Sequence, residues 1–340
     1  MTLLVLEHIT AGGMAGEPVP VALADAGMAM WKAVVEDFAA LGHKVATTAG
    51  ERAPSKDDPH AVCITPTVPY EQTIERVAKA SDAALIIAPE SGGILAAYED
   101  TLRQWGVRSL GCDPRAIALC ADKFLLGDHW MNAGFSSPPT GTGPTAALLA
   151  AVAGKMREKL TTWVFKPRDG AGCEHTYLAH TLADLDALNS KLAPDIQWVA
   201  QNYFSGIPAS VSFIVHDGKA RPLLAGRQLV QGDTQLQYKG GKIPLDRELT
   251  ERAVALATQA IASIQGLAGF VGVDLVIGDE PKDDTVIEVN PRLTVSYCGL
   301  RKLCRTNLAA ALLDASAPIE WNTGSVSLNA SGIATKDGWS

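Results

Sequence analysis

The stretch VIEVNPRLT, residues 286–294, decides the fold, because one face of an otherwise apolar strand carries Glu288, Asn290 and Arg292. Side chains alternate between the two faces of a strand, so these three residues project from the same side. A buried strand is normally apolar throughout or alternates apolar and polar residues. An acid, an amide and a cation in sequence on one face favour a ligand site, with an ordinary solvated face as the alternative.

The segment just before it, GFVGVDLVIGDEPKDD at 269–284, is predicted to be the hairpin partner of this strand. With the turn centred on Pro281, antiparallel pairing sets Asp274 opposite Glu288. Directly opposed Cβ atoms lie roughly 4.5–5.5 Å apart, and like charges there repel. The other face is expected to pack on the core through Val273, Leu275, Ile277, Ile287 and Val289.

A hard divalent cation would relieve this repulsion, because Mg²⁺ (or Mn²⁺) takes oxygen ligands and leaves room for phosphate oxygens. The spacing therefore predicts a metal site built from Asp274, Glu288 and Asn290. Arg292, just past the strand, is expected to stabilise charge in a transferring phosphoryl group or a tetrahedral intermediate, unless it is a surface ion pair.

A second hairpin, WVFKPRDGAGCEHTYLAH at 163–180, places Lys166 inside an apolar strand. Lysines are rarely buried without a partner, so Lys166 is expected to face a pocket or reach solvent. The loop that follows holds Arg168, Gly170, Ala171 and Gly172, whose amides can approach phosphate. An ordinary glycine-containing hairpin is the alternative. The chain contains no G-x-x-x-x-G-K-[ST], G-x-G-x-x-G, G-x-S-x-G or H-E-x-x-H motif.

The composition bounds the class of protein. A chain of 340 residues with 47% hydrophobic and 19% charged residues predicts two or three ordinary globular domains. A net charge of −8 argues against nucleic-acid and anionic-membrane partners and favours small-molecule substrates. Six cysteines without a C-x-x-C pair indicate a reducing compartment. The N-terminus lacks a basic n-region, and the apolar run at 145–154 is too short to span a bilayer, so we expect a cytoplasmic protein.

The order of elements predicts four segments. Residues 1–111 alternate strand and helix, as in a parallel α/β domain whose ligands gather at the loops 7–13 and 88–93. Residues 112–201 begin with helices, pass through a Pro/Gly-rich linker at 135–145, and contain the glycine-bearing hairpin. Residues 202–318 hold period-two strands, a helix at 246–265 and the acidic hairpin, and residues 319–340 read as a polar tail.

Taken together, five stretches resemble the ATP-grasp ligases: ADK at 121–123, WVFKPRDGAG at 163–172, WVAQNYFSG at 198–206, GVDLVIGD at 272–279 and IEVNPRLT at 287–294. The resemblance implies an α/β protein with an N-terminal parallel domain and two lobes that hold ATP between them. It implies that Lys123 and Lys166 contact phosphates beneath the 168–174 loop, with the metal held as described. It also implies a hinge that reads adenine, formed by Gln201, Asn202, Tyr203 and Phe204. No acid occurs from 201 to 216 to bind the ribose, which departs from many members.

Two further stretches, LLVLEHITAGGM at 3–14 and SGIPASVSFI at 205–214, resemble the tyramine–glutamate ligases of methanofuran-type cofactor biosynthesis. This implies an amide formed between glutamate and tyramine, or tyrosine for a methylofuran in one-carbon-metabolising bacteria, through an acyl phosphate with release of ADP and phosphate. Glu7 and Glu90 are then expected to bind an ammonium group. Catalytic contacts fall to Arg292, Lys166 and Arg227, and Arg227, Arg301 or Arg305 are expected to bind a substrate carboxylate.

Three readings remain open at this point. The leading one is a carboxylate–amine ligase, for which the resemblance to similar ligases implies a homodimer. The second keeps the chemistry but changes the acceptor, as in D-alanine–D-alanine or peptide ligases. The third is a nucleotide-binding regulatory protein without catalysis, against which the set of Asp274, Glu288, Asn290 and Arg292 counts.

Overall fold

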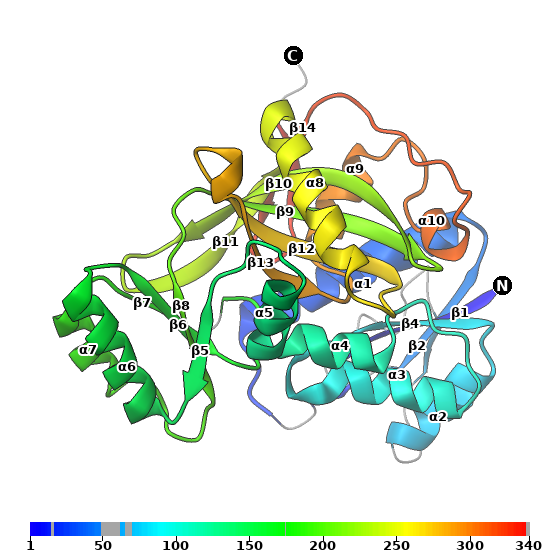
Figure 1. Ribbon diagram of the computed structural model, residues 1–340. Helices are drawn as coiled ribbons and strands as arrows, with labels where there is room; N and C mark the ends of the chain where they lie inside the picture. The colour runs from blue at the N-terminus through cyan, green and yellow to red at the C-terminus, as the bar shows by residue number, and fades with distance from the viewer. Residues whose placement is uncertain (15–16, 49–61, 65–69, 174, 338–340) are drawn as a thin grey trace.

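The computed structural model describes residues 1–14, 17–48, 62–64, 70–173 and 175–337, and these form two sheets flanked by helices (Figure 1). The N-terminal sheet is parallel, and the second sheet, of eleven strands, is antiparallel in its pairings. The predicted α/β class, with a parallel domain ahead of two lobes, is confirmed.

The N-terminal sheet has the order β3-β2-β1-β4. Its strands are β1 (Thr2–Glu7), β2 (Lys44–Thr48), β3 (Val62–Ile64) and β4 (Ala83–Ile87), and its helices are α1 (Val21–Ala40), α2 (Tyr70–Lys79) and α3 (Ile94–Gln104). A short 3-10 turn, η1 (Ser91–Gly93), joins β4 to α3. β1 and β4 are buried along almost their whole length because helices pack on both sides. Ser109 forms only an isolated parallel bridge with Ala84 and adds no further strand to this sheet.

Two short helices follow, α4 (Pro114–Ala121) and α5 (Lys123–Asn132). Asp113 caps α4 by accepting from the backbone N–H of Arg115, and Pro114 begins the helix. Asp122 caps α5 by accepting from the backbone N–H groups of Phe124 and Leu125. The second cap fixes where Lys123 enters the site described below.

The small lobe is a four-stranded sheet under two helices (green in Figure 1). It contains β5 (Thr140–Gly143), β6 (Trp163–Pro167), β7 (Thr176–Ala179), β8 (Trp198–Asn202), α6 (Thr145–Glu158) and α7 (Leu182–Leu188). The predicted linker at 135–145 was wrong in part, since Thr140–Gly143 pair with β8. Glycines at 141 and 143 concealed this edge strand from a propensity-based prediction.

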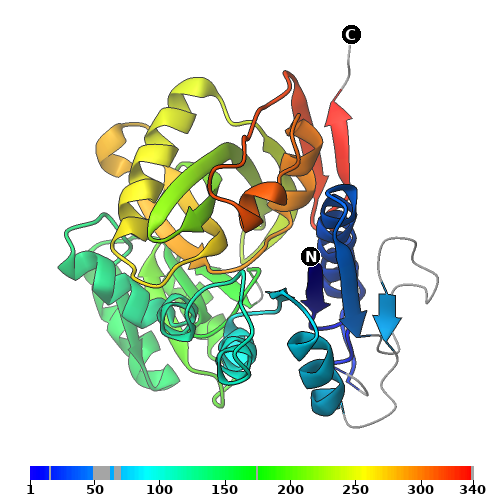
Figure 2. The same cartoon turned by 90° about the vertical axis from the view of Figure 1, so that its right-hand side faces the viewer.

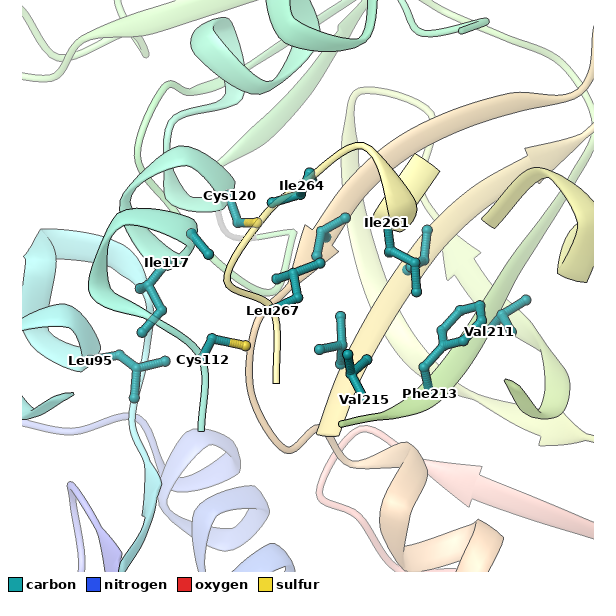
Figure 3. Close-up of a cluster of buried hydrophobic side chains, with 14 of the residues drawn as sticks. Leu95, Cys112, Ile117, Cys120, Val211, Phe213, Val215, Ile261, Ile264 and Leu267 are labelled. Atoms are coloured by element: carbon teal, nitrogen blue, oxygen red, sulfur yellow. The ribbon is translucent and has the colours of Figure 1, made fainter. Parts of the chain in front are cut away.

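The large lobe carries the acidic hairpin. Its strands run in the order β13-β12-β9-β10-β11 and comprise β9 (Ile207–His216), β10 (Lys219–Gln231), β11 (Gln235–Ile243), β12 (Gly269–Ile277) and β13 (Thr285–Asn290), with the turn η2 (Pro281–Asp283). α8 (Arg247–Ala262) packs on one face of this sheet, and Figure 3 shows side chains of α4, α8 and β9 meeting in that core. β11 also pairs with β7 through Gln235–Tyr177 and Leu236–Thr176, so one sheet runs through both lobes.

The last segment is not a tail. After α9 (Ser296–Leu303) and α10 (Ala310–Leu313), β14 (Ser325–Asn329) pairs with β11, and β15 (Ala334–Asp337) pairs with β14. Figure 2 shows these strands (red) near α1 (blue). Residues 332–334 line a hollow together with Ala29, Ala33 and Glu36 of that helix. The polar sequence concealed them because an edge hairpin with one solvated face needs few apolar residues. Val326 and Leu328 supply the buried positions.

Candidate active site

Asp274 on β12 lies directly opposite Glu288 on β13, as the sequence spacing predicted. The pairing shifts by one residue immediately afterwards, so that Leu275 pairs with Val286. Such a bulge inserts one extra residue and reverses which side chains face the core. Val286 is therefore fully buried and Ile287 only half-buried, which corrects the expectation that Ile287 packs on the core.

The two carboxyl groups are held in a shared polar environment. The side-chain amide of Gln228 donates to Asp274 Oδ1 at 2.8 Å, and that of Asn290 donates to Oδ2 at 3.1 Å. Burial and the Glu288 charge raise the pKa of Asp274 well above its ordinary value. Burial also acts to raise the pKa of Glu288, but the Lys123 and Lys166 ammonium groups outweigh it and lower that pKa. The two pKa values therefore shift in opposite directions, and a proton is held more readily by Asp274 than by Glu288.

This donor set fits a divalent cation. In the free protein, a proton on Asp274 relieves the repulsion between the two acids. A bound cation would relieve the same repulsion while both carboxylates are ionised. Asn290 can offer its carbonyl oxygen by turning its amide over. Within the described ranges no three His, Cys, Asp or Glu side chains gather as metal ligands, so a cation between Asp274 and Glu288 would need the Asn290 oxygen, phosphate or water as well.

Two lysines supply the positive charge that faces these acids. Lys166 is 6% exposed on β6, and its burial lowers its pKa while Glu288 acts to raise it. Lys123, at the first turn of α5, donates to the Gly170 carbonyl oxygen. The structure therefore brings both predicted phosphate-binding lysines to the acidic hairpin, although they come from different elements.

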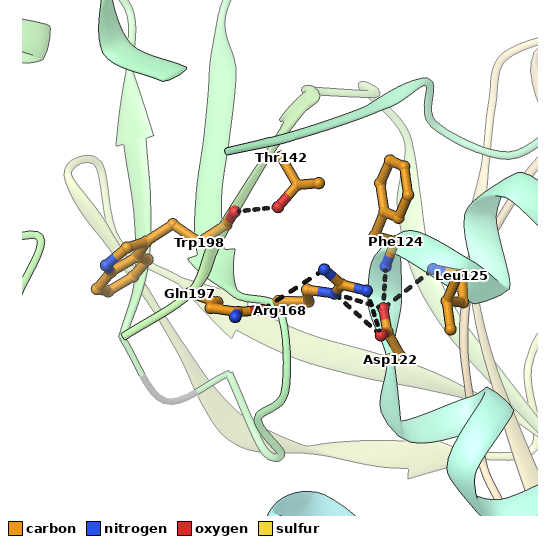
Figure 4. Close-up of polar contacts among 7 residues, drawn as sticks. All are labelled: Asp122, Phe124, Leu125, Thr142, Arg168, Gln197 and Trp198. Carbon is orange, nitrogen blue, oxygen red and sulfur yellow. Dashed lines mark hydrogen bonds and ion pairs between the residues drawn. The ribbon is translucent and has the colours of Figure 1, made fainter. Parts of the chain in front are cut away.

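Arg168 does not point at this cluster but binds Asp122, as Figure 4 shows. Its Nε lies 2.9 Å from Asp122 Oδ1, its Nη2 lies 2.7 Å from Oδ2, and its guanidinium lies over the Phe124 ring. The same carboxylate caps α5. This carboxylate takes up Nε and Nη2 of the guanidinium, so in the structure Arg168 fixes the base of the glycine loop.

The glycine loop itself uses left-handed backbone at its tip. Gly172 has φ of 69° and Cys173 has φ of 61°. Only glycine adopts this conformation without strain, and this explains why position 172 is a glycine. Ala171 is half-buried and Gly170 accepts from Lys123, so this part of the loop lies against the lysine, while Gly172 at the tip is exposed.

The predicted hinge follows β8. Gln201 is buried and its side chain donates to Thr140 Oγ1 at 2.7 Å, so it braces β5 rather than facing a ligand. The Tyr203 backbone N–H donates to the Thr162 carbonyl oxygen at 2.9 Å, and its side chain is exposed. Asn202 is paired with Trp163 in the ladder, and Phe204 is half-buried. Any reading of adenine by this segment must use the remaining backbone groups.

Two residues predicted for different tasks meet in the structure. The Arg292 Nε donates to the Glu90 carboxylate, and their side chains are 15% and 6% exposed. Burial acts to lower the pKa of Arg292, but Glu90 and then Glu288 raise it, so the guanidinium stays charged. Glu90 lies in the loop after β4, so this ion pair joins the N-terminal sheet to the end of β13.

Glu7 lies at the carboxyl end of β1, the edge where ligands of parallel sheets bind. It is 3% exposed, accepts from the Thr10 backbone N–H at 2.8 Å, and its pKa is raised by burial. Nearby, His8 Nδ1 lies 3.1 Å from the Tyr98 hydroxyl, which lies 3.3 Å from the Tyr70 hydroxyl. This polar chain was not predicted, because Tyr70 and Tyr98 come from helices far along the sequence.

Three predicted arginines are not brought to the cluster. Arg227 is exposed and pairs with Ala209 of β9, which in turn pairs with Leu275 of β12. The Arg227 side chain therefore lies on the face of the sheet that α8 covers, and Asp274 lies on the other face. Arg301 binds Asp37 on α1 at 2.6 Å and Glu36 at 3.0 Å. Arg305 pairs with Glu320 at the surface. Arg301 and Arg305 are thus both paired with acids of the protein itself.

Gln228, Tyr238 and Cys173 surround Asp274 and were missed by the sequence prediction. Gln228 donates to Asp274, while burial and the Asp274 charge raise the pKa of Tyr238. Burial and then Glu288 raise the pKa of Cys173 to about 12, so this thiol stays protonated at neutral pH. Strand alternation would place Gln228 here once the β9–β10 register was known, but that register includes a bulge that no local pattern reveals.

Comparisons with known proteins agree with this geometry. A family model described as an ATP-grasp domain matches residues 120–296, and one described as a pre ATP-grasp 3 domain matches residues 43–117. A tyramine–L-glutamate ligase of Methanocaldococcus fervens is 28% identical over 220 residues, covering 65% of this chain and 62% of the relative. The match thus spans less than two thirds of that relative.

Among solved structures, an ATP-grasp superfamily protein of Archaeoglobus fulgidus superposes with a TM-score of 0.71 at 22% identity, covering 97% of this chain and 92% of the other. The biotin carboxylase domain of a Hydrogenobacter thermophilus 2-oxoglutarate carboxylase, solved with MgADP, gives 0.69 at 15% identity, covering 96% and 73%. These likenesses show the fold. In the described segments, no helix is both long enough and apolar enough to cross a membrane.

Proposed function

The chain belongs to the ATP-grasp family, and on that premise we propose that it is an ATP-dependent ligase that joins a carboxylate to an amine. The observation that carries the proposal is the pair of opposed carboxylates, Asp274 and Glu288, faced by the ammonium groups of Lys123 and Lys166. Phosphoryl transfer needs positioned cations more than a protein nucleophile. A site that only bound a nucleotide would have no need for two repelling acids beside those lysines.

For the substrates, we propose glutamate as the carboxylate and tyramine or a tyrosine-like amine as the acceptor, in a methanofuran- or methylofuran-type pathway. The support is the similarity to the Methanocaldococcus tyramine–L-glutamate ligase over 65% of the chain. A buried acid at the edge of the N-terminal sheet, Glu7, suits an ammonium group. The hydroxyls of Tyr70 and Tyr98 beside it offer further polar contacts.

In the proposed reaction, Lys123, Lys166 and the glycine-loop amides hold the triphosphate. Asp274, Glu288 and Asn290 would hold a divalent cation, which would neutralise charge on the phosphate oxygens. A substrate carboxylate oxygen attacks the γ-phosphorus, and the bond to the ADP oxygen breaks. The amine nitrogen then attacks the acyl carbon, phosphate leaves with the bonding pair, and the nitrogen loses a proton. Arg292 stabilises the oxyanion that forms at that carbon.

A coupled assay tests this proposal. The protein is incubated with ATP, MgCl₂, glutamate and a panel of amines, and ADP, phosphate and the amide are measured. We expect stoichiometric ADP and phosphate with one amine class, and none without the carboxylate. Release of AMP would exclude the acyl-phosphate route. Activity with D-alanine or peptide acceptors only would change the substrate assignment, and binding of ATP without turnover on any pair would favour a regulatory binder.

A further inference from the structure

We propose that Glu90 and Asp169 are positioning residues that act through one short turn, residues 90–92, to couple the glycine loop to Arg292. The proposal rests on the function proposed above and extends it. It gives the N-terminal sheet a part in the chemistry, since this turn begins three residues after the buried strand β4. It also gives Glu90 a different role from the ammonium binding expected from the sequence.

One end of the turn holds Arg292. The Glu90 carboxylate accepts from Nε in an ion pair whose two side chains are 6% and 15% exposed. A guanidinium is a rigid planar fork, so fixing Nε sets the plane in which both terminal nitrogens lie. Among the residues that the structure describes, Nη1 makes only a long contact, 3.4 Å, with the Leu293 carbonyl oxygen. The terminal nitrogens are therefore oriented yet not saturated, as an oxyanion-binding group requires.

The other end of the turn holds the glycine loop. The backbone N–H of Gly92 donates to Asp169 Oδ2 at 2.8 Å. Gly92 and Gly93 have φ of 63° and 67°, so the amide is presented by a left-handed turn that other residues adopt only with strain. This pair of glycines therefore fixes the direction in which the Gly92 N–H points.

Asp169 itself is anchored to the phosphate-binding side. It forms a bridge with Asp122, and the Lys123 backbone N–H donates to the Arg168 carbonyl oxygen at 3.0 Å. The next residue, Gly170, accepts from the Lys123 side chain. A shift of the loop on nucleotide binding would therefore be transmitted through Gly92 to Glu90, two residues away, and so to Arg292.

The geometry also separates the two acids at the sheet edge. Glu90 is occupied by Arg292, whereas Glu7 contacts the Thr10 backbone and no cation among the described residues. Glu7 is thus left to receive a substrate ammonium group. Glu90 serves the reacting carbon only through Arg292.

The test is a double-mutant cycle with Glu90→Gln, Asp169→Ala and the double variant. Asp169→Asn retains an oxygen that accepts from Gly92 and serves as the rescue. Glu320→Gln, which removes an exposed acid paired with Arg305, is the matched control. We measure kcat, the KM of each substrate, melting temperature, and the affinity for Mg²⁺ with a non-hydrolysable ATP analogue by calorimetry.

We expect each single variant to lower kcat at least about tenfold with the KM values changed less than about threefold, and the double variant to match the worse single one. Coupled residues give such non-additive effects, whereas independent residues multiply their losses. Asp169→Asn and Glu320→Gln should behave like the wild type. Multiplying losses would overturn the coupling. A large rise in the amino-acid KM at unchanged kcat in Glu90→Gln would instead make Glu90 the ammonium ligand.

A measurement without turnover keeps this proposal distinct from the proposed function. Hydrogen exchange is followed with and without the ATP analogue at the amides of residues 90–95. In the wild type the analogue should slow exchange at the Gly92 amide, and Asp169→Ala should abolish that effect while the analogue still binds. Equal slowing in Asp169→Ala would refute the link even if the enzyme proved to use other substrates.

Discussion

Asp274 and Glu288 face each other across β12 and β13, and they can share the space between them only with a proton or a cation. Gln228 and Asn290 hold Asp274 in place, while Lys123 and Lys166 keep Glu288 ionised. In the free protein, the proton that burial and Glu288 favour on Asp274 relieves the repulsion between the two acids. Replacement of that proton by a divalent cation is the basis of the first prediction.

Asp274→Asn should abolish the stabilisation by Mg²⁺ without weakening the metal-free protein. Asparagine resembles the protonated aspartic acid that burial and Glu288 already favour, so the melting temperature in EDTA should be no lower than that of the wild type. Turnover should fall at least about a hundredfold, since each catalytic electrostatic contact is worth roughly 3 kcal/mol. Calorimetric scans with EDTA and with MgCl₂ measure both effects.

The control for this experiment is Glu280→Gln in the turn of the same hairpin, where Glu280 forms an exposed pair with Lys282 at 2.8 Å. That variant should retain the Mg²⁺-dependent rise in melting temperature. If Asp274→Asn retained it as well, the metal would have to bind elsewhere.

Asp122→Ala should destabilise the protein by roughly 2–3 kcal/mol, because one carboxylate both caps α5 and binds Arg168. Arg168→Ala should cost less, since the cap survives. Arg168→Ala should weaken the affinity for an ATP analogue no more than Asp122→Ala does, measured by calorimetry alongside urea unfolding. A tenfold loss of affinity confined to Arg168→Ala would restore the phosphate contact expected from the sequence.

Glu99→Gln should stabilise the protein above neutral pH and not below pH 4.5. Glu99 is 3% exposed beside a hollow of about 320 Å³, its Oε1 has no hydrogen-bond partner within the described chain, and burial raises its pKa from 4.5 to about 7. Because the folded pKa exceeds the unfolded one, the contribution of Glu99 to stability is most favourable below pH 4.5 and is lost as the pH rises toward 7.

The difference between Glu99→Gln and wild type should therefore grow from about zero at pH 4.5 to at most about 3 kcal/mol at pH 8, by the linkage of 1.36 kcal/mol per pKa unit. Urea unfolding at several pH values measures it. Glu158→Gln on the exposed end of α6 is the control and should show no such trend. A difference independent of pH would show that Glu99 does not titrate in this range.

Arg301 and Arg305 form a matched pair that separates structure from substrate binding. Arg301→Ala leaves Asp37, which also accepts from the Tyr297 hydroxyl at 2.6 Å, without its ion-pair partner, so we expect a loss of roughly 2–4 kcal/mol. Arg305→Ala removes an exposed pair and should change stability by less than about 0.5 kcal/mol. The KM for glutamate should be unchanged in both variants. A rise of tenfold or more in either KM would show that the substituted arginine binds the substrate.

Local pattern was enough to predict the elements that carry strong periodicity. The hairpin at 269–290 with Asp274 opposite Glu288 and the hairpin containing Lys166 could be predicted because each depends on residues close in sequence. β5 and the β14–β15 hairpin could not, since edge strands with small or polar residues have no strong local pattern. The one-residue bulge after Asp274 likewise escaped a strict alternation of period two.

The sequence by itself was enough to select the candidate site residues, which are two opposed acids, two lysines and an arginine. Only the tertiary structure decided how these groups are partnered. It paired Arg292 with Glu90 from the N-terminal sheet and Arg168 with Asp122, and it placed Arg227 on the far face of the sheet. The reason is physical: hydrophobic patterning and turn chemistry act over a few residues, whereas a buried ion pair joins segments as far apart as Glu90 and Arg292 and forms only once packing excludes water from both.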